Sequence, residues 1–334
     1  MKILITGGTG FLGRHLVWQL AKEGHEVVYT GRNVEVARSI AKAAASPVEF
    51  VHLEHGSAHA REQLLACSQS VDVLIHSAAL TSPWGSRSAF QHANVESTRE
   101  VLAACQHNAI PGLIHISSPS IYFDFKDQLN IPEDSVLPRG VNEYARSKQV
   151  AEQLTMSAEL PLRVILRPRA IFGPWDNALL PRLLRLLRYG RLPLLRGGRA
   201  LLDMTYVDNI VHAIKLAMKL PPSETTQIFN ISNGEPIAAA DLFIKMAEQF
   251  SIPLHTVDRP YLLANLVAGL LECGAKLWPG WEPPFTRYSL ATLAYSQTLD
   301  LSRARNVLGY SPVVSLDEGI ARTARWRKQQ GLQA

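Results

Sequence analysis

The N-terminal stretch KILITGGTGFLG, residues 2–13, decides the fold class of this 334-residue chain. Residues 2–6 form a short, mostly apolar run that predicts a buried strand, and glycine-rich sequence follows it at once. From Leu12 to Glu23 the apolar residues recur at helical spacing, and Gly24 supplies a C-terminal stop. A strand, a glycine-rich turn and a helix in this order predict the first βα unit of a parallel sheet.

The same turn predicts a dinucleotide site. Glycines here permit a tight turn, let the backbone approach a pyrophosphate and let the helix pack closely on the strand. The N-terminus of the helix adds free N–H groups and the positive end of its dipole. The expected cofactor contacts are Gly7, Thr9, Gly10, Phe11, Leu12 and Gly13. A glycine-rich string alone also forms ordinary turns, so the inference depends on the flanking strand and helix.

Strand and helix patterns alternate over the first half of the chain. Further strands are expected at residues 26–30, 48–53, 71–76, 112–117 and 162–167, with helices between them that include residues 88–108 and 142–159. After residue 168, prolines and glycines interrupt shorter segments. The sequence therefore predicts an α/β fold: a Rossmann-type doubly wound parallel sheet over residues 1–170 and a smaller C-terminal substrate-binding lobe over residues 171–334. Some later segments are expected to return to the sheet.

The end of the second predicted strand bears on the choice of cofactor. An NAD site usually has an acidic residue there, which accepts hydrogen bonds from the ribose 2′-hydroxyl. This chain has Gly31 and then Arg32, and a guanidinium suits a 2′-phosphate. We therefore expect NADP(H) to be preferred, with NAD(H) as the alternative cofactor. A solvated surface arginine is the alternative interpretation of Arg32.

A tyrosine and a lysine one helical turn apart form the candidate catalytic pair. Tyr144 and Lys148 share one face of the helix predicted over residues 142–159. A nearby cation favours the phenolate of a tyrosine, whose pKa is ordinarily near 10. A hydroxyl at the end of the fifth strand could polarise a substrate carbonyl, and Ser117, Ser118 and Ser120 all lie there. Turn formation is the alternative role for each serine.

Together these motifs resemble the extended short-chain dehydrogenases/reductases of the NAD-dependent epimerase/dehydratase superfamily. The matching stretches are TGGTGFLG (6–13), HSAA (76–79), NVEST (94–98), SSPSIY (117–122) and the Tyr144/Lys148 pair. The resemblance implies that Ser118, four residues before Tyr122, is the catalytic serine beside Tyr144 and Lys148. It also implies that Ala78, Ala79, Tyr144, Lys148 and Pro168 contact the cofactor.

Later segments resemble the 3β-hydroxysteroid dehydrogenase branch of this family. They are LRPRAIFGPWD (166–176), DMTYVDN (203–209) and SQTLD (296–300), while ALTSPWG (79–85) is similar to bacterial 2-alkyl-3-oxoalkanoate reductases. The resemblance implies NADPH-dependent reduction of a keto group in a large apolar 3-oxo substrate, either a 3-oxo acid or a steroid-like compound. Many members of the steroid branch prefer NAD, against which Arg32 argues. The candidate substrate contacts are Thr81, Trp84, Ser120, Phe172 and Trp175.

Two other classes of protein are alternatives. A nucleotide-sugar epimerase or dehydratase needs polar contacts in the second lobe, and the leucine-rich segment 179–195 argues against it. A non-catalytic NADP-sensing protein has no need of the phenol of Tyr144. Arginines beside the expected apolar pocket, among them Arg169 and Arg182, are candidates to hold a substrate carboxylate.

Composition excludes several classes. With 47% apolar residues, 19% charged residues and a net charge of +5, the chain is an ordinary globular protein without the strong basic excess of a nucleic-acid binder. Its three scattered cysteines have no disulfide or metal-ligand spacing, so we expect a cytoplasmic protein and no metal. His76 and His115 are expected to be hydrogen-bonded core histidines.

Two helical segments allow more than one interpretation. The segment Tyr261–Trp281 predicts an amphipathic helix, for which core packing is favoured over contact with substrate or lipid. Arg182, Arg185, Arg188 and Arg191 predict a solvated basic edge, with peripheral contact to an anionic membrane as the alternative. The family resemblance implies a homodimer paired through residues 88–108 and 142–159.

Overall fold

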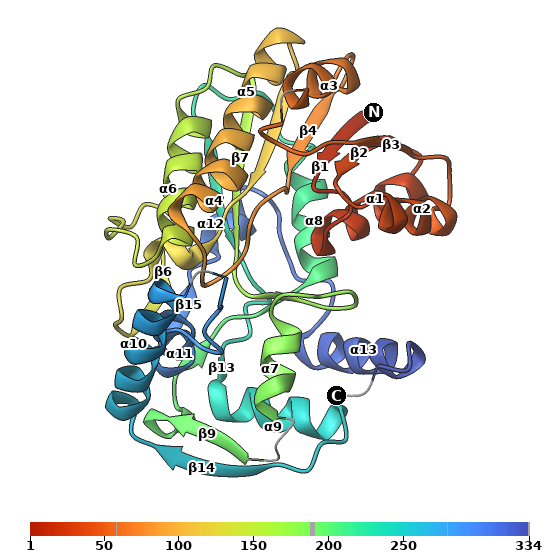
Figure 1. Ribbon diagram of the computed structural model, residues 1–334. Coiled ribbons are helices and arrows are strands. Elements are labelled where there is room, and N and C mark those ends of the chain that lie inside the picture. The colour runs from red at the N-terminus through yellow and green to blue at the C-terminus, as the bar shows by residue number, and fades with distance from the viewer. Residues whose placement is uncertain (58, 188–190, 279, 333–334) are drawn as a thin grey trace.

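The computed structural model describes the whole chain except residues 58, 188–190, 279 and 333–334, and its centre is one parallel sheet (Figure 1). The sheet has seven strands in the order β12-β7-β5-β4-β1-β2-β3, all paired in parallel. Their bounds are β1 Lys2–Thr6, β2 Glu26–Gly31, β3 Glu49–His52, β4 Val73–His76, β5 Gly112–Ile116, β7 Leu162–Pro168 and β12 Gln227–Ile231. The chain reverses direction across the sheet between β1 and β4, which confirms the predicted doubly wound Rossmann-type fold.

Alternate residues of the first strand enter two separate cores. Ile3 and Ile5 belong to one buried cluster and Leu4 belongs to another, on the opposite face of the sheet. All three side chains are fully buried. A strand covered on both faces reads as a continuous apolar run, which is why the sequence pattern located it.

Helices cover both faces of the sheet. Their bounds are α1 Phe11–Lys22, α2 Val34–Ala43, α3 Ala60–Cys67, α4 Arg87–Phe90, η1 Gln91–Glu96, α5 Ser97–His107, η2 Pro119–Tyr122, α6 Glu143–Met156 and α8 Val207–Ala217. In Figure 1, α5 and α6 lie on one side of the sheet, while α1, α2 and α8 lie on the other. The helix expected over residues 88–108 is interrupted by one π-helical segment, η1.

The remaining elements form most of the lower part of the molecule in Figure 1. They are β6 Gln128–Ile131, β8 Ile171–Phe172, α7 Leu180–Leu187, β9 Arg191–Leu195, η3 Arg196–Gly198, β10 Leu201–Leu202, β11 Thr205–Tyr206, β13 Ile237–Ala238, α9 Ala239–Gln249, β14 His255–Arg259, α10 Tyr261–Leu277, α11 Arg287–Ala294, β15 Gln297–Leu299, α12 Ser302–Asn306 and α13 Leu316–Gln329. Two segments from beyond residue 170 lie with the large sheet: β12 pairs with β7, and α8 packs against α1.

Helix α10 differs from its sequence interpretation. It ends at Leu277, four residues short of the expected Trp281. Its large apolar side chains face outward, with Leu262 and Leu270 exposed by 80% and 66%, so the prediction of core packing is wrong. The buried positions of the helix are instead the small residues Ala268 and Ala275, which permit close approach of neighbouring segments. No helix in the described part of the chain is both long enough and apolar enough to cross a bilayer.

The leucines of α7 also differ in their role. Leu180, Leu183, Leu184 and Leu187 are all buried in the larger hydrophobic cluster with β1 and α8. They therefore fill a core rather than line an open pocket, so the leucines of segment 179–195 do not argue against a nucleotide-sugar enzyme. Residues 188–190 of that segment, including Arg188, lie outside the described residues.

Candidate active site

The glycine loop brings the first helix against the first strand. Gly7 has φ +71°, which favours glycine, and a Cβ there would lie 2.7 Å from the Cα of Ala78. A Cβ on Gly13 would lie 2.2 Å from the carbonyl oxygen of Gly7. Gly10 is the N-cap of α1 and has no side chain over the N–H groups of the first turn. A cradle without Cβ atoms, open at a helix N-terminus, fits the pyrophosphate of a dinucleotide.

The end of β2 lies beside this loop. A Cβ on Gly31 would come within 2.2 Å of Thr9 Oγ1, so the strand end and the loop are in close contact. Arg32 follows; its side chain is exposed and forms no ion pair with the described residues. Arg14, which the sequence analysis missed, donates to the carbonyl oxygens of Thr9 and Gly10 at 3.2 and 3.3 Å. The sequence signal for Arg14 was its position four residues after the N-cap glycine. With Arg32, it is the second guanidinium at the loop.

The three catalytic candidates meet at the carboxyl edge of the sheet. Ser118 follows β5 and accepts a hydrogen bond from the N–H of Ser120 at 3.2 Å. Tyr144 and Lys148 lie one turn apart on α6, and Lys148 donates to the Ile116 carbonyl oxygen at 2.8 Å. The Ser118 hydroxyl lies within hydrogen-bonding reach of the Tyr144 phenol, and α6 places the Lys148 ammonium one turn further along, against the end of β5.

Burial controls the ionisation of the pair on α6. It raises the pKa of Tyr144 to about 12, against a hydrogen bond from Ser118 that lowers it. Burial also lowers the pKa of Lys148 to about 8, which the charge of Glu152 opposes. The expectation that Lys148 depresses the pKa of Tyr144 is therefore not met in this structure, because burial of the phenol dominates. At neutral pH, Tyr144 carries its proton and can donate it.

Asn94 holds the surroundings of this pair in place. Its side chain donates to Ser147 Oγ at 2.8 Å and accepts from the N–H of Leu80 at 2.7 Å. It lies in the π-helical segment η1, and such irregular turns occur often at functional sites. Asn94 thus connects the loop after β4 to α6. The sequence analysis quoted it within a motif but assigned it no role.

The two buried histidines behave differently. His76 contacts Thr6 Oγ1 at 2.7 Å and Thr98 Oγ1 at 3.2 Å, which confirms the prediction for that residue. Both ring nitrogens of His115 lack a hydrogen-bond partner among the described residues, so the same prediction is wrong there. The His115 ring instead packs against that of His76, at 5.3 Å between centroids. Burial lowers the pKa of both imidazoles well below the usual range, so both are neutral at pH 7.

The substrate candidates separate into two groups. Thr81 is exposed and Trp84 half-buried on the loop after β4, and Ser120 is buried with an unpartnered hydroxyl among the described residues. Phe172 packs on Tyr206, and Trp175 packs on Trp18 and Trp326. These are packing contacts, so we do not carry Phe172 and Trp175 into the proposed substrate site.

Tyr288 of α11 is a site residue that the sequence analysis missed. Its electrostatic interaction with Tyr144 contributes to the raised pKa of that residue, and its ring lies 5.4 Å from that of Phe123. Phe90 lies on another side of Tyr144, at 6.1 Å between ring centroids. Phe90 therefore packs directly on the candidate proton donor, and Tyr288 lies near it. No local pattern in the sequence marks Tyr288, because α11 reaches the site only through the fold of the second lobe.

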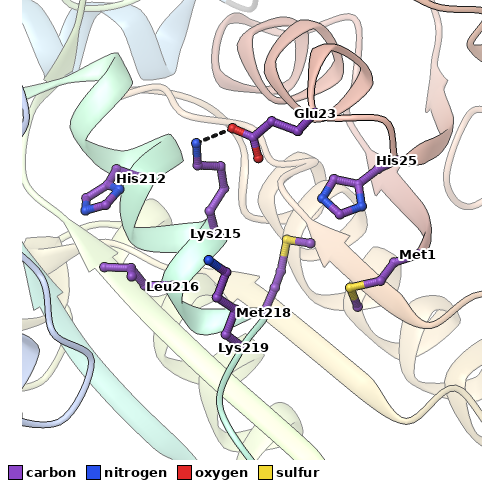
Figure 2. Close-up of a pocket in the computed structure, with 8 residues that line it drawn as sticks. All are labelled: Met1, Glu23, His25, His212, Lys215, Leu216, Met218 and Lys219. Atoms are coloured by element: carbon purple, nitrogen blue, oxygen red, sulfur yellow. Dashed lines mark hydrogen bonds and ion pairs between the residues drawn. The ribbon is translucent and has the colours of Figure 1, made fainter.

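A separate hollow lies at the opposite edge of the sheet. Figure 2 shows this cavity of about 400 Å³, in which Lys215 and Glu23 form an ion pair at 2.5 Å. Met1 and His25 of its lining come directly before β1 and β2, at the amino ends of the strands. Ligands of open α/β sheets bind at the carboxyl ends, so this cavity is not the candidate active site.

Comparison with known proteins agrees with the motifs. Residues 3–232 match the model of the "NAD dependent epimerase/dehydratase family". The chain is 38% identical to "Uncharacterized protein YbjS" of Escherichia coli K12, covering 99% of each chain. It is 32% identical to a 2-alkyl-3-oxoalkanoate reductase of Stenotrophomonas maltophilia, covering 96% of this chain and 98% of the relative. It is 31% identical to an Arabidopsis thaliana 3β-hydroxysteroid dehydrogenase/decarboxylase, covering 96% and 78%.

A solved structure shares the fold. The dTDP-glucose 4,6-dehydratase DesIV of Streptomyces venezuelae, with NAD bound, superposes with a TM-score of 0.77 at 23% identity, covering 100% of this chain and 99% of DesIV. At that identity the likeness shows the architecture alone. The family match and the relatives establish the class of protein: the chain belongs to the NAD-dependent epimerase/dehydratase family and is an NAD(P)-dependent oxidoreductase.

Proposed function

We propose that this enzyme uses NADPH to reduce the keto group of a large apolar 3-oxo substrate to an alcohol. The observation that carries the proposal is the meeting of Ser118, Tyr144 and Lys148 at the same edge of the sheet as the glycine loop. Relatives named as reductases of 2-alkyl-3-oxoalkanoates support the substrate class. The ring of Phe90 supports it further, because it offers apolar surface beside Tyr144, where the carbonyl would react.

Each side chain has a distinct role in this mechanism. When bound, the dinucleotide supplies a hydride to the carbonyl carbon. Ser118 donates a hydrogen bond to the carbonyl oxygen, and Tyr144 transfers its phenolic proton to that oxygen as the alcohol forms. Lys148 would hold the ribose of the bound dinucleotide through its ammonium. Asn94 keeps the loop after β4 and α6 in register around them.

Preference for NADPH is supported by the end of β2. Arg32 is exposed there without an ion-pair partner among the described residues, and Gly31 stands where an NAD site commonly has an acid. A free guanidinium next to the adenosine ribose favours a 2′-phosphate by charge-assisted hydrogen bonds. NADH is expected to serve less well, and Arg32 is the residue expected to separate the two cofactors.

Steady-state kinetics with a matched substrate series test the proposal. With NADPH as reductant, kcat/KM should rise by about fourfold for each added methylene in 2-alkyl-3-oxo acids, until the apolar pocket is filled. UDP-glucose and UDP-galactose should be neither epimerised nor dehydrated under the same conditions. No dependence on alkyl length, together with turnover of either sugar nucleotide, would replace this proposal by the epimerase alternative. Absence of all turnover with NADPH or NADH would favour a sensing protein.

A further inference from the structure

Arg169 carries a guanidinium that the protein itself does not satisfy. The residue directly follows β7, and its backbone is held by hydrogen bonds with Ile231 at 3.0 Å and Thr205 at 2.6 Å. Its side chain makes no hydrogen bond or ion pair with any described residue, and its Nε is covered from solvent. The side chain is half-buried, and covering its Nε from water without a partner is costly, a cost that a ligand accepting a hydrogen bond there would relieve.

Arg167, two residues earlier and within β7, provides the contrast. Its guanidinium donates to both carboxylate oxygens of Glu152, at 2.9 and 2.6 Å, and it also binds Tyr122. That charge is fully paired inside the fold. The guanidinium of Arg169 has no such partners, although the two arginines belong to one short segment of the sequence.

The two ionisable neighbours of Arg169 leave its charge available. Asp203 is buried and lies near enough to interact electrostatically, but the two form no ion pair within 4 Å. One oxygen of Asp203 accepts from the N–H of Leu299 at 2.7 Å. Tyr288 is the second neighbour, and its phenol carries no charge at neutral pH because burial raises its pKa. The unpaired guanidinium of Arg169 therefore lies near the Tyr288 phenol, which is a neutral hydrogen-bond donor.

The position of this pair is on the substrate side of the site. Tyr288 interacts electrostatically with Arg169 and also with Tyr144, so it lies near both the guanidinium and the proton donor. Pro168, the neighbour of Arg169, ends the strand next to β5, which carries Ser118 at its own end. The glycine loop for the pyrophosphate lies at the end of β1, which is separated from β5 by β4.

We propose that Arg169 binds the carboxylate of the substrate, with the Tyr288 hydroxyl as a second donor, and so makes the enzyme selective for 3-oxo acids over neutral ketones. The inference depends on the proposed reductase function and names its substrate class. A guanidinium and a phenol suit a carboxylate, because they present fixed N–H and O–H donors toward its two oxygens. An anion held there keeps a 3-oxo group within a few bonds of the anchor and close to Tyr144.

The test compares an acid with its neutral counterpart in the stable, oxidative direction. The substrates are 2-hexyl-3-hydroxydecanoate and its methyl ester, with NADP⁺ as oxidant. Arg169→Gln should lower kcat/KM for the acid by about 10- to 100-fold and change that for the ester by less than about threefold. Arg169→Lys should recover part of the loss, and Tyr288→Phe should lower the acid-to-ester ratio by a smaller factor. The matched control is Arg325→Gln, because Arg325 is exposed on α13 and paired with Glu318 at 3.0 Å.

A binding measurement separates this inference from the proposed function. Calorimetric titration of the NADP⁺-loaded protein should show that the hydroxy acid binds at least about tenfold more tightly than the ester, and that Arg169→Gln removes the difference. An unchanged acid-to-ester ratio in Arg169→Gln, or equal binding of the two ligands by the unmodified protein, overturns the role of Arg169 while leaving reduction of neutral ketones intact. Tight binding of UDP alone that requires Arg169 overturns it in favour of a diphosphate. Failure to turn over either ligand, with acid binding dependent on Arg169, instead contradicts the proposed function alone.

Discussion

Replacing Lys148 by methionine is expected to stabilise the protein while abolishing catalysis. The lysine is 3% exposed, and its ammonium makes one hydrogen bond, to the Ile116 carbonyl oxygen at 2.8 Å. Burial lowers its pKa from 10.5 to about 8, with Glu152 opposing the shift. At pH 7 the lysine is protonated in both the folded and the unfolded chain, so the folded state bears the cost of the buried charge.

The pKa difference sets the size of that cost. Lowering the pKa from 10.5 to about 8 corresponds to about 3 kcal/mol, at 1.36 kcal/mol per unit. Methionine has similar length and no charge, and loss of the hydrogen bond to Ile116 offsets about 1 kcal/mol of the gain. We therefore expect Lys148→Met to raise the free energy of unfolding at pH 7 by about 1–3 kcal/mol.

The pH dependence gives this prediction its sign. Between pH 8 and pH 10.5 the unfolded chain binds the lysine proton more strongly than the folded chain, so the stability of the unmodified protein rises with pH across that window. The advantage of the variant should be full below pH 8 and should shrink toward pH 10.5. Urea unfolding at pH 7 and at pH 10 measures it, with Lys245→Met as control, because Lys245 is paired with Asp317 on the surface at 2.6 Å. A variant less stable than the parent at pH 7, or one with the same advantage at both pH values, would show that the buried ammonium does not bear this cost.

Three further substitutions test the remaining parts of the site. Tyr144→Phe should lower kcat by about 10²- to 10⁴-fold with cofactor affinity nearly unchanged, and retention of more than about half of the parent kcat would refute the proton-donor role. Arg32→Ala should weaken NADPH binding by about 1.5–3 kcal/mol in fluorescence titrations and leave NADH binding almost unaltered, whereas equal losses would mean a structural role. Gly13→Ala should lower the free energy of unfolding, measured by thermal denaturation, by about 1–3 kcal/mol, because the added Cβ would lie 2.2 Å from the Gly7 carbonyl oxygen. Gly274→Ala, whose nearest neighbour outside its own helix would be 3.8 Å away, should show no such loss.

Local physical rules made most of the Rossmann sheet predictable. The bounds of β1 agree with the predicted residues 2–6, and those of β5 and β7 differ from prediction by one residue at their C-terminal ends. Strands buried on both faces read as continuous apolar runs, and the glycine loop reflects steric limits that operate within a few residues. The Tyr144/Lys148 pair was predictable for the same reason, because one helical turn fixes their relation.

Contacts between segments far apart in the sequence could not be predicted from local patterns. Helix α10 has the amphipathic pattern of a packed helix, yet its leucines face outward. An apolar stripe on a helix does not predict whether another segment of the chain covers it. His115 and His76 occupy equivalent positions on adjacent strands, but only His76 meets hydroxyl groups, which come from Thr6 and Thr98. Both outcomes depend on segments far away in the chain.

The sequence by itself thus determined the fold class, the dinucleotide loop and the catalytic pair, since steric and helical constraints act between near neighbours. Tertiary structure alone decided which charges are paired. Arg167 and Arg169 are two residues apart and chemically identical, but α6 brings the Glu152 carboxylate into contact with the first. Among the described residues, the second lobe brings to the other the neutral phenol of Tyr288 and Asp203, which forms no ion pair with it. The electrostatic free energy of a buried charge depends on its partners in space, and those partners come from wherever the chain folds back.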